Sequence, residues 1–212
     1  IGIAFPMLQK TASTVYIERK QGYTRPLRGN LCCDTLIISM KQKTARRKKV
    51  SEKKSSIAWF PLLGWIALCE AAGIVGSFFT VSAIPTWYAT LARPSFSPPN
   101  WVFGPVWTVL YMLMGIAVYR VWRLGMHKPA VKTAVSLFIV HLFFNAIWSI
   151  LFFGAKNIPL AFVDITVIWV TLIYIIFRFE KLDRASAYLL LPYLAWISFA
   201  TVLNYNYWLL NA

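Results

Sequence analysis

Residues 86–123 read TWYATLARPSFSPPNWVFGPVWTVLYMLMGIAVYRVWR, and this stretch combines a rigid loop with a membrane span. Pro94, Pro98 and Pro99 fix their own φ angles and disfavour helix at the residue before each of them. We therefore expect an extended, stiff loop in the first half. About 18 residues without a charge then precede Arg120, close to the length that crosses a hydrocarbon core at about 1.5 Å per residue. The second half is predicted to be a transmembrane helix.

The rest of the chain has the composition of a membrane protein. Hydrophobic residues make up 58% of the 212 residues, aromatic residues make up 17%, and the mean hydropathy is +0.59. These values are well above those of soluble domains. We expect helices at residues 57–84, 102–124, 131–154, 158–177 and 187–210. The predicted fold class is all-α, a bundle of five transmembrane helices with a proline-rich loop at 85–101 between the first two.

Turn-forming residues separate the expected helices. Gly154 stands where a helix C-cap is wanted, and Pro159 falls where the first turn of the next helix tolerates proline. Lys128 and Pro129 mark a turn between the second and third helices. Five spans therefore fit the chain with short connections, apart from the proline-rich loop.

Charge divides the chain into two predicted parts. Residues 1–56 hold 13 of the 22 Lys and Arg and 3 of the 7 acids, and are expected to be a basic, disordered arm before the transmembrane domain at 57–212. Met40 is an alternative start, in which case residues 1–39 are not native. Cys32 and Cys33 then have no role, and no disulfide framework or metal site is indicated by the cysteine and histidine spacing.

The same charge distribution predicts orientation. Counted alternately along the loops, one side of the membrane receives 20 Lys and Arg and the other receives 2. The positive-inside rule then places the amino terminus in the cytoplasm and the carboxy terminus outside, in the cell membrane. A basic arm beside a membrane domain is typical of a topology signal or an anionic-lipid contact, so no nucleic-acid partner is expected.

Polar and aromatic residues are expected to share one layer beneath the proline-rich loop. Counting roughly 1.5 Å per residue from the outer helix ends puts them roughly 9 to 21 Å deep. They are Trp107, Asn204, Asp164, Asn145, Tyr111, Ala200, His141, Trp196 and Glu70. If these side chains point inward, they line a cavity suited to a flat aromatic ligand. The alternative is a membrane scaffold in which the aromatic layer is only core packing.

Several motifs in order carry a resemblance to a known family. They are Trp87-Tyr88, the run from Arg93 to Thr108, Leu110-Tyr111, the run from Asn145 to Ser149, Phe152-Phe153-Gly154, the run from Leu191 to Trp196 and the run from Phe199 to Asn204. Across residues 57–211 the chain closely resembles the TspO/MBR family of translocator proteins, once called peripheral-type benzodiazepine receptors, and is similar to its bacterial type.

The resemblance implies a five-helix bundle, usually a homodimer, that binds tetrapyrroles such as protoporphyrin IX and haem as ligands and requires no cofactor. The family's pocket positions fall on Tyr88, Trp107, Asn145, Trp196 and Ala200. The depth layer adds two further candidate ligand-binding residues, Tyr111 and His141. Some bacterial relatives degrade protoporphyrin in light, which makes Trp107 and Trp196 the only candidate catalytic residues.

The remaining polar residues allow more than one interpretation. His141 can offer an axial nitrogen to haem iron, but a lone histidine more often completes a hydrogen bond. Intramembrane Glu70 and Asp164 are functional candidates by default, or they join helices through hydrogen bonds, Glu70 to His141 and Asp164 to Asn145. The animal sterol-recognition pattern needs Lys or Arg after a tyrosine near the carboxy end, and this chain has none there.

Binding of tetrapyrroles or similar apolar ligands, for transport, sensing or regulation, is the predicted function. The alternative is light-dependent porphyrin degradation at the two candidate tryptophans. Hydrolytic chemistry is not indicated, because the sequence shows no Ser/His/Asp arrangement, paired carboxylates or phosphate loop. Small residues at Ala72/Gly76 and Gly73/Ser77 permit close helix approach, either between two copies or within one.

Overall fold

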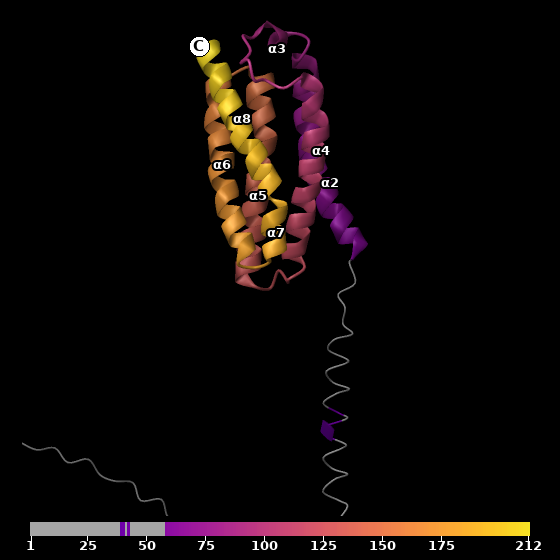
Figure 1. Cartoon of the computed structure of the whole chain (residues 1–212). Coiled ribbons are helices and arrows are strands. Elements are labelled where there is room, and N and C mark those ends of the chain that lie inside the picture. Colours follow the sequence, from indigo (N-terminus) through magenta and orange to yellow (C-terminus); the bar gives the residue numbers. More distant parts are fainter. Residues whose placement is uncertain (1–38, 41, 43–57) are drawn as a thin grey trace, which may run out of the picture. The chain divides into compact units, whose positions relative to one another are not determined.

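The computed structural model describes residues 39–40, 42 and 58–212. Cys32, Cys33 and most of the predicted basic arm lie outside the described residues. Residues 58–212 fold into helices with short connections, and no strand occurs among them (Figure 1). The predicted all-α class is confirmed.

Helices account for most of this part of the chain. They are α2 (Trp59–Ala83), α3 (Trp87–Thr90), α4 (Asn100–Trp122), α5 (Pro129–Ser149), the π-helix η1 (Ile150–Gly154), α6 (Ile158–Glu180), α7 (Arg184–Leu189) and α8 (Leu191–Leu210). Among the described residues, five segments are long and apolar enough to cross a membrane: α2, α4, α5 with η1, α6, and α7 with α8. The predicted five-span bundle is confirmed, and the chain is a multi-pass membrane protein.

The third span ends differently from the prediction. Its last turn widens into a π-helix, in which the Ala155 N–H donates to the Ile150 carbonyl at 2.7 Å. Gly154 ends this π-helix and is not the residue with a left-handed backbone; that residue is Lys156, with φ of 54°. The expectation of a glycine cap was therefore wrong. The next span begins as expected, with proline in its first turn and the Asn157 side chain accepting from the Leu160 N–H.

The fifth span begins at Arg184, three residues before the predicted start, and is broken at Leu190 between α7 and α8. Pro192 lies in the first turn of α8 and has no N–H to donate to a carbonyl of α7. The Leu190 N–H instead bonds the carbonyls of Ala187 and Tyr188, which closes α7 tightly. The break lets α8 leave the direction of α7.

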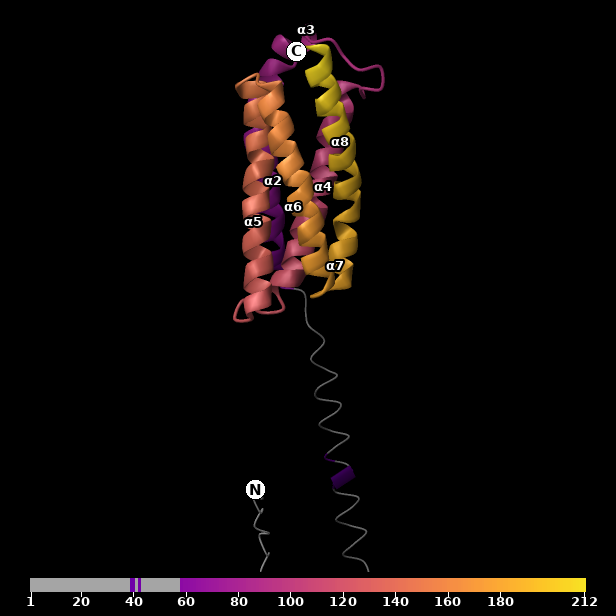
Figure 2. The same cartoon turned by 90° about the vertical axis from the view of Figure 1, so that its left-hand side faces the viewer.

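The bundle has two distinct ends (Figures 1 and 2). One end, here called the α3 end, carries α3 and the carboxy terminus; the other, the α7 end, carries α7 and the α4–α5 turn. Around the bundle α4 packs on α2, α2 on α5, α5 on α6, and α6 on α8. The ring closes where α4 packs on α7, whereas α4 and α8 contact each other little. The two helices meet instead through large side chains, such as Phe103 of α4 and Trp196 of α8.

Two glycines allow α2 to pack closely inside this chain. A Cβ on Gly115 of α4 would stand 2.6 Å from the Ile66 Cα, so the two backbones meet there. A Cβ on Gly73 of α2 would collide with the Tyr111 ring. Gly76 is buried and faces the Ser149 side chain. Gly73 and Gly76 of the first span thus pack against other helices of the same copy.

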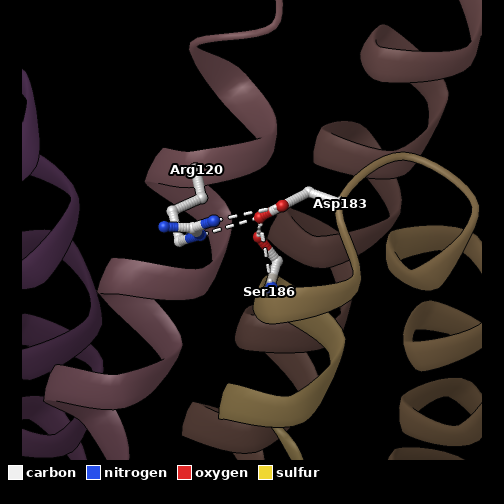
Figure 3. A network of polar contacts seen from close by, with 3 residues as sticks. All are labelled: Arg120, Asp183 and Ser186. Carbon is white, nitrogen blue, oxygen red and sulfur yellow. Dashed lines mark hydrogen bonds and ion pairs between the residues drawn. The ribbon is translucent and has the colours of Figure 1, made fainter. Parts of the chain in front are cut away.

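A charged contact joins α4 to α7 at the α7 end (Figure 3). The Arg120 Nε donates to Asp183 Oδ2 at 2.7 Å and its Nη2 donates to Oδ1 at 3.1 Å. Asp183 is also the N-cap of α7, because its Oδ2 accepts from the Ser186 backbone N–H at 3.2 Å and hydroxyl at 2.5 Å. One carboxylate therefore fixes the start of the fifth span against the second.

Asp183→Asn should lower the free energy of unfolding by about 0.5 to 1 kcal/mol, because the ion pair is lost while the amide oxygen still caps α7. Arg120 is 39% exposed, so solvent screening keeps the effect small. The hydrogen bond from Arg120 holds the pKa of Asp183 below its ordinary 3.8. The extra stability of the wild type over the variant should be fully present above pH 3.8 and should decrease below it, whereas the stability of Asp183→Asn should lack this pH dependence. Thermal unfolding in detergent against pH measures both, and equal slopes for the two proteins would contradict the assignment.

Candidate ligand-binding cavity

A cavity of about 480 Å³ lies within the bundle at the α3 end. All five spans contribute to its wall, α2 with Glu70, Gly73 and Thr80 and α6 with Ile165 and Ile168. Its volume falls in the range of about 300 to 1,000 Å³ that is usual for small-molecule sites.

Aromatic rings from α4 and α8 line this cavity. Trp107 stacks on Tyr111 of the same helix, with ring centroids 5.2 Å apart and planes at 28°. Trp196 of α8 meets the Phe103 ring edge-on at 5.8 Å. Both tryptophans line the cavity and are only partly buried. The wall therefore presents flat, polarisable surfaces, which favour an aromatic ligand.

The proline-rich loop closes the α3 end. The expectation that it is extended throughout was wrong. Its prolines restrict only residues near Pro94, Pro98 and Pro99, and this leaves residues 87–90 free to form α3. A turn follows, in which the Ser97 N–H donates to the Pro94 carbonyl at 3.0 Å. The loop is therefore a folded cover.

The end of α8 holds this cover in place. The Tyr207 hydroxyl lies 2.7 Å from the Tyr88 hydroxyl and 3.1 Å from the Ser97 hydroxyl. Asn211 makes a two-way contact with Ala92, accepting from its N–H at 2.9 Å and donating to its carbonyl at 3.0 Å. Tyr88 and Tyr207 also line the cavity, so the cover and the cavity share these two phenols.

Polar groups beside the tryptophans form one hydrogen-bonded chain. The Tyr111 hydroxyl donates to Asn145 Oδ1 at 2.5 Å, and Asn145 Nδ2 donates to the Tyr193 hydroxyl at 2.8 Å. His141 Nε2 lies 3.0 Å from the same Tyr193 oxygen, and its Nδ1 lies 2.9 Å from the Thr171 hydroxyl. The chain connects α4, α5, α8 and α6, so it ties four spans together beneath the cavity.

The structure brings six of the seven predicted ligand-binding residues to the cavity wall: Tyr88, Trp107, Tyr111, Asn145, Trp196 and Ala200. His141 does not join them. It is 1% exposed, both ring nitrogens have protein partners, and it does not line the cavity. An axial bond from His141 to a haem in this cavity is therefore excluded by position.

Two expected hydrogen bonds are absent from the described part of the chain. Glu70 does not bond His141, whose nitrogens are occupied by Thr171 and Tyr193, and Glu70 lines the cavity instead. Asp164 does not bond Asn145, whose amide is used by two tyrosines. The Asp164 Oδ2 is buried without a hydrogen-bond partner among the described residues. Equal depth along two helices was insufficient to identify pairs, because depth says nothing of the direction in which a side chain points.

Sequence reasoning missed several residues of the wall. Trp148 and Phe152 line the cavity and stack on each other at 5.2 Å, and Tyr207 forms part of its cover. Trp148 was within reach of helix periodicity, because it lies three residues after Asn145 on the same face. Phe152 was not, since it belongs to the π-helix, where the α-helical period no longer holds.

Comparison with known proteins shows to which family this five-span bundle is related. The model of the TspO/MBR family matches residues 46–209. The chain belongs to the TspO/MBR family. The match includes all the residues that line the cavity, from Glu70 to Tyr207. The family resemblance seen in the sequence motifs is confirmed.

Individual relatives within the TspO/MBR family are similar over most of their length. The tryptophan-rich protein TspO of Archaeoglobus fulgidus is 46% identical over 151 residues, which cover 71% of this chain and 97% of that protein. The translocator protein of Homo sapiens is 36% identical over 151 residues, 71% of this chain and 89% of that protein. A tryptophan-rich sensory protein of Cereibacter sphaeroides is 33% identical over 153 residues, 72% and 92% respectively. This chain is thus a membrane protein of the TspO/MBR family, similar over most of their length to proteins described as tryptophan-rich, translocator and sensory.

Proposed function

We propose that this protein binds tetrapyrroles, with protoporphyrin IX and haem as the expected ligands, inside the cavity at the α3 end. The observation that carries the proposal is the pair of indoles, Trp107 of α4 and Trp196 of α8, on the wall of one cavity of about 480 Å³. Ring faces stack favourably on a macrocycle, and the apolar wall excludes water from it. The ligand's transport or sensing would then depend on opening of the cover.

Contacts to the ring, rather than to a bound metal, carry recognition in this proposal. None of the residues that line the cavity is a histidine, cysteine or methionine, the side chains that most often hold haem iron. The Tyr88, Tyr111 and Tyr207 phenols and the Asn145 amide supply hydrogen bonds for polar substituents on the macrocycle. A metal-free porphyrin should therefore bind as well as its iron complex.

Titration of the purified protein with protoporphyrin IX, followed by quenching of tryptophan fluorescence, tests this function. We expect micromolar binding, about −8 kcal/mol, and affinities for the metal-free, zinc and iron forms that agree within about threefold. An affinity that appears only with the iron form would contradict a site built on ring contacts. The absence of saturable binding to any of the three would refute the proposed function.

Light-dependent degradation of bound porphyrin is the second candidate, because the two candidate catalytic indoles, Trp107 and Trp196, lie on the cavity wall. Trp196→Phe should keep most of the affinity, since an aromatic face remains, but should lose turnover, since a benzene ring is much harder to oxidise than an indole. Absorbance of the bound porphyrin under illumination measures this, with Trp169→Phe, outside the cavity wall, as the control. Bleaching no faster than in empty micelles would remove the enzyme candidate.

Orientation and assembly complete the proposal. The α3 end faces outward and the α7 end faces the cytoplasm, since Arg123, Lys128, Lys132 and Lys181 gather near the α7 end and the positive-inside rule applies. Labelling of Ser95→Cys, but not Met126→Cys, by an impermeant maleimide in intact cells is the expected result, and the reverse pattern would invert the topology.

The functional unit is a homodimer in a lipid bilayer, which crosslinking in native membranes tests.

A further inference from the structure

His141 is buried, bonded at both ring nitrogens and outside the cavity wall, so its role differs from that of a ligand contact. It stands in the middle of the hydrogen-bonded chain that begins at Tyr111 on the cavity wall and ends at Thr171 on α6. A chain of this kind transmits orientation, because each hydroxyl or imidazole that accepts at one side donates at the other.

The direction of the chain is fixed at its α6 end. The Thr171 hydroxyl lies 2.8 Å from the Val167 carbonyl oxygen and 3.0 Å from the Ile168 carbonyl oxygen. A carbonyl has no hydrogen to give, so in both of these bonds Thr171 is the donor. With its one hydrogen placed there, Thr171 accepts from His141, and the imidazole hydrogen is then on Nδ1.

The remaining hydrogens follow from that tautomer. His141 Nε2 has only a lone pair, so it accepts from the Tyr193 hydroxyl. The Tyr193 oxygen is then free to accept from Asn145 Nδ2, which turns Asn145 Oδ1 toward the Tyr111 hydroxyl. Each bond of the chain then joins one donor to one acceptor, and the orientation of the Asn145 amide at the cavity wall is linked to Thr171 on the neighbouring helix α6.

The two tyrosines of the chain also hold an indole. Tyr111 stacks on Trp107 at 5.2 Å, and Tyr193 meets the same indole edge-on at 6.1 Å with planes at 62°. Both hydroxyls bond to the one Asn145 amide. The chain therefore sets the position of Trp107 as well as the polarity of the amide beside it.

We infer that His141, Tyr193 and Thr171 are positioning residues for the ligand site, which fix the Asn145 amide and the Trp107 ring without touching the ligand. The porphyrin part of the inference rests on the proposed function; the direction of the chain does not. A substitution at His141 should consequently act through Asn145, and a side chain with one donor and one acceptor should replace the imidazole.

The direction of the chain is tested without any ligand. Nitrogen-15 labelling of the two histidines gives two imidazole spectra, and His127→Gln identifies the exposed one. We expect His141 to carry its hydrogen on Nδ1, and Thr171→Val to disturb its resonances. A hydrogen on Nε2 would reverse the chain and overturn the inference, whatever the protein binds.

Binding then tests the positioning role, with induced circular dichroism of the porphyrin's Soret band as a report of a fixed ligand orientation. His141→Leu should weaken protoporphyrin IX binding about tenfold and alter the Soret signal, and His141→Gln should retain both. In an Asn145→Ala background, His141→Leu should cause no further loss. Ser198→Ala, which removes a separate α6–α8 hydrogen bond to Trp169, is the control and should leave binding unchanged.

The outcomes separate the two claims. Equal loss from His141→Leu with and without Asn145, or no loss in a folded variant, would overturn the positioning role. The Nδ1 tautomer in a wild-type protein that binds no porphyrin would refute the proposed function and leave the directed chain standing.

Discussion

Replacement of both Trp107 and Trp196 by alanine is expected to weaken protoporphyrin IX binding about 30- to 150-fold, a loss of about 2 to 3 kcal/mol. Each indole presents an aromatic face to the cavity, and such a contact contributes about 0.5 to 1.5 kcal/mol beyond the area it buries. The double variant removes both indole faces, so a flat ligand loses its stacking on Trp107 of α4 and on Trp196 of α8. Fluorescence of the porphyrin itself measures the affinity, because it does not depend on the number of remaining tryptophans.

A matched control for this variant is Trp169→Ala with Trp208→Ala. These two indoles belong to α6 and α8, and neither lines the cavity; Trp169 bonds Ser198, and Trp208 packs on Phe162 and Tyr205. The control protein should bind as the wild type does. Equal affinity in the control and in the Trp107/Trp196 variant would place the ligand outside this cavity.

The fold could be predicted from the sequence because a bilayer leaves few choices. An uncharged apolar run of span length has to satisfy its own backbone hydrogen bonds, so five such runs predict five helices. The ends were less predictable. Whether a proline-flanked segment such as residues 87–90 makes a helical turn, or whether a span closes through a π-helix as at Ile150–Gly154, depends on packing that lies far away in the sequence.

The depth of the site residues in the membrane could be predicted from the sequence, but the direction in which their side chains point could not. Counting residues placed Trp107, Asn145 and Trp196 in one layer, and all three line the cavity. The same counting put His141 and Asp164 in that layer, yet both face the packed interior. The hydropathy of a helix that is apolar all round carries no signal for rotation about its axis, so only the packed structure distinguishes the wall from the core.

The shape of the cavity also depends on how closely α2 approaches α4. Gly73 of α2 and Tyr111 of α4 both line the cavity and contact each other, and this close approach is possible because Gly115 has no side chain. Gly115→Ala should therefore destabilise the protein by about 1 to 3 kcal/mol, as overpacking of a tight contact does. The added Cβ would stand 2.6 Å from the Ile66 Cα and 2.9 Å from the Ile66 nitrogen, and a backbone cannot rotate away as a side chain can. Separation of α2 from α4 would displace the ring contacts of Tyr111, so porphyrin affinity should fall together with stability.

Gly64→Ala in α2 provides the comparison. A Cβ there would meet nothing within 4 Å, and alanine favours helix over glycine by roughly 0.8 to 1 kcal/mol. The unfolding temperature in detergent should consequently rise slightly for Gly64→Ala and fall for Gly115→Ala. If the two variants unfolded at the same temperature, close backbone contact between α2 and α4 would not be what holds the second span in place. Opposite shifts in unfolding temperature would instead show that the close contact of Gly115 with Ile66 holds α2 and α4, and with them the cavity wall, in place.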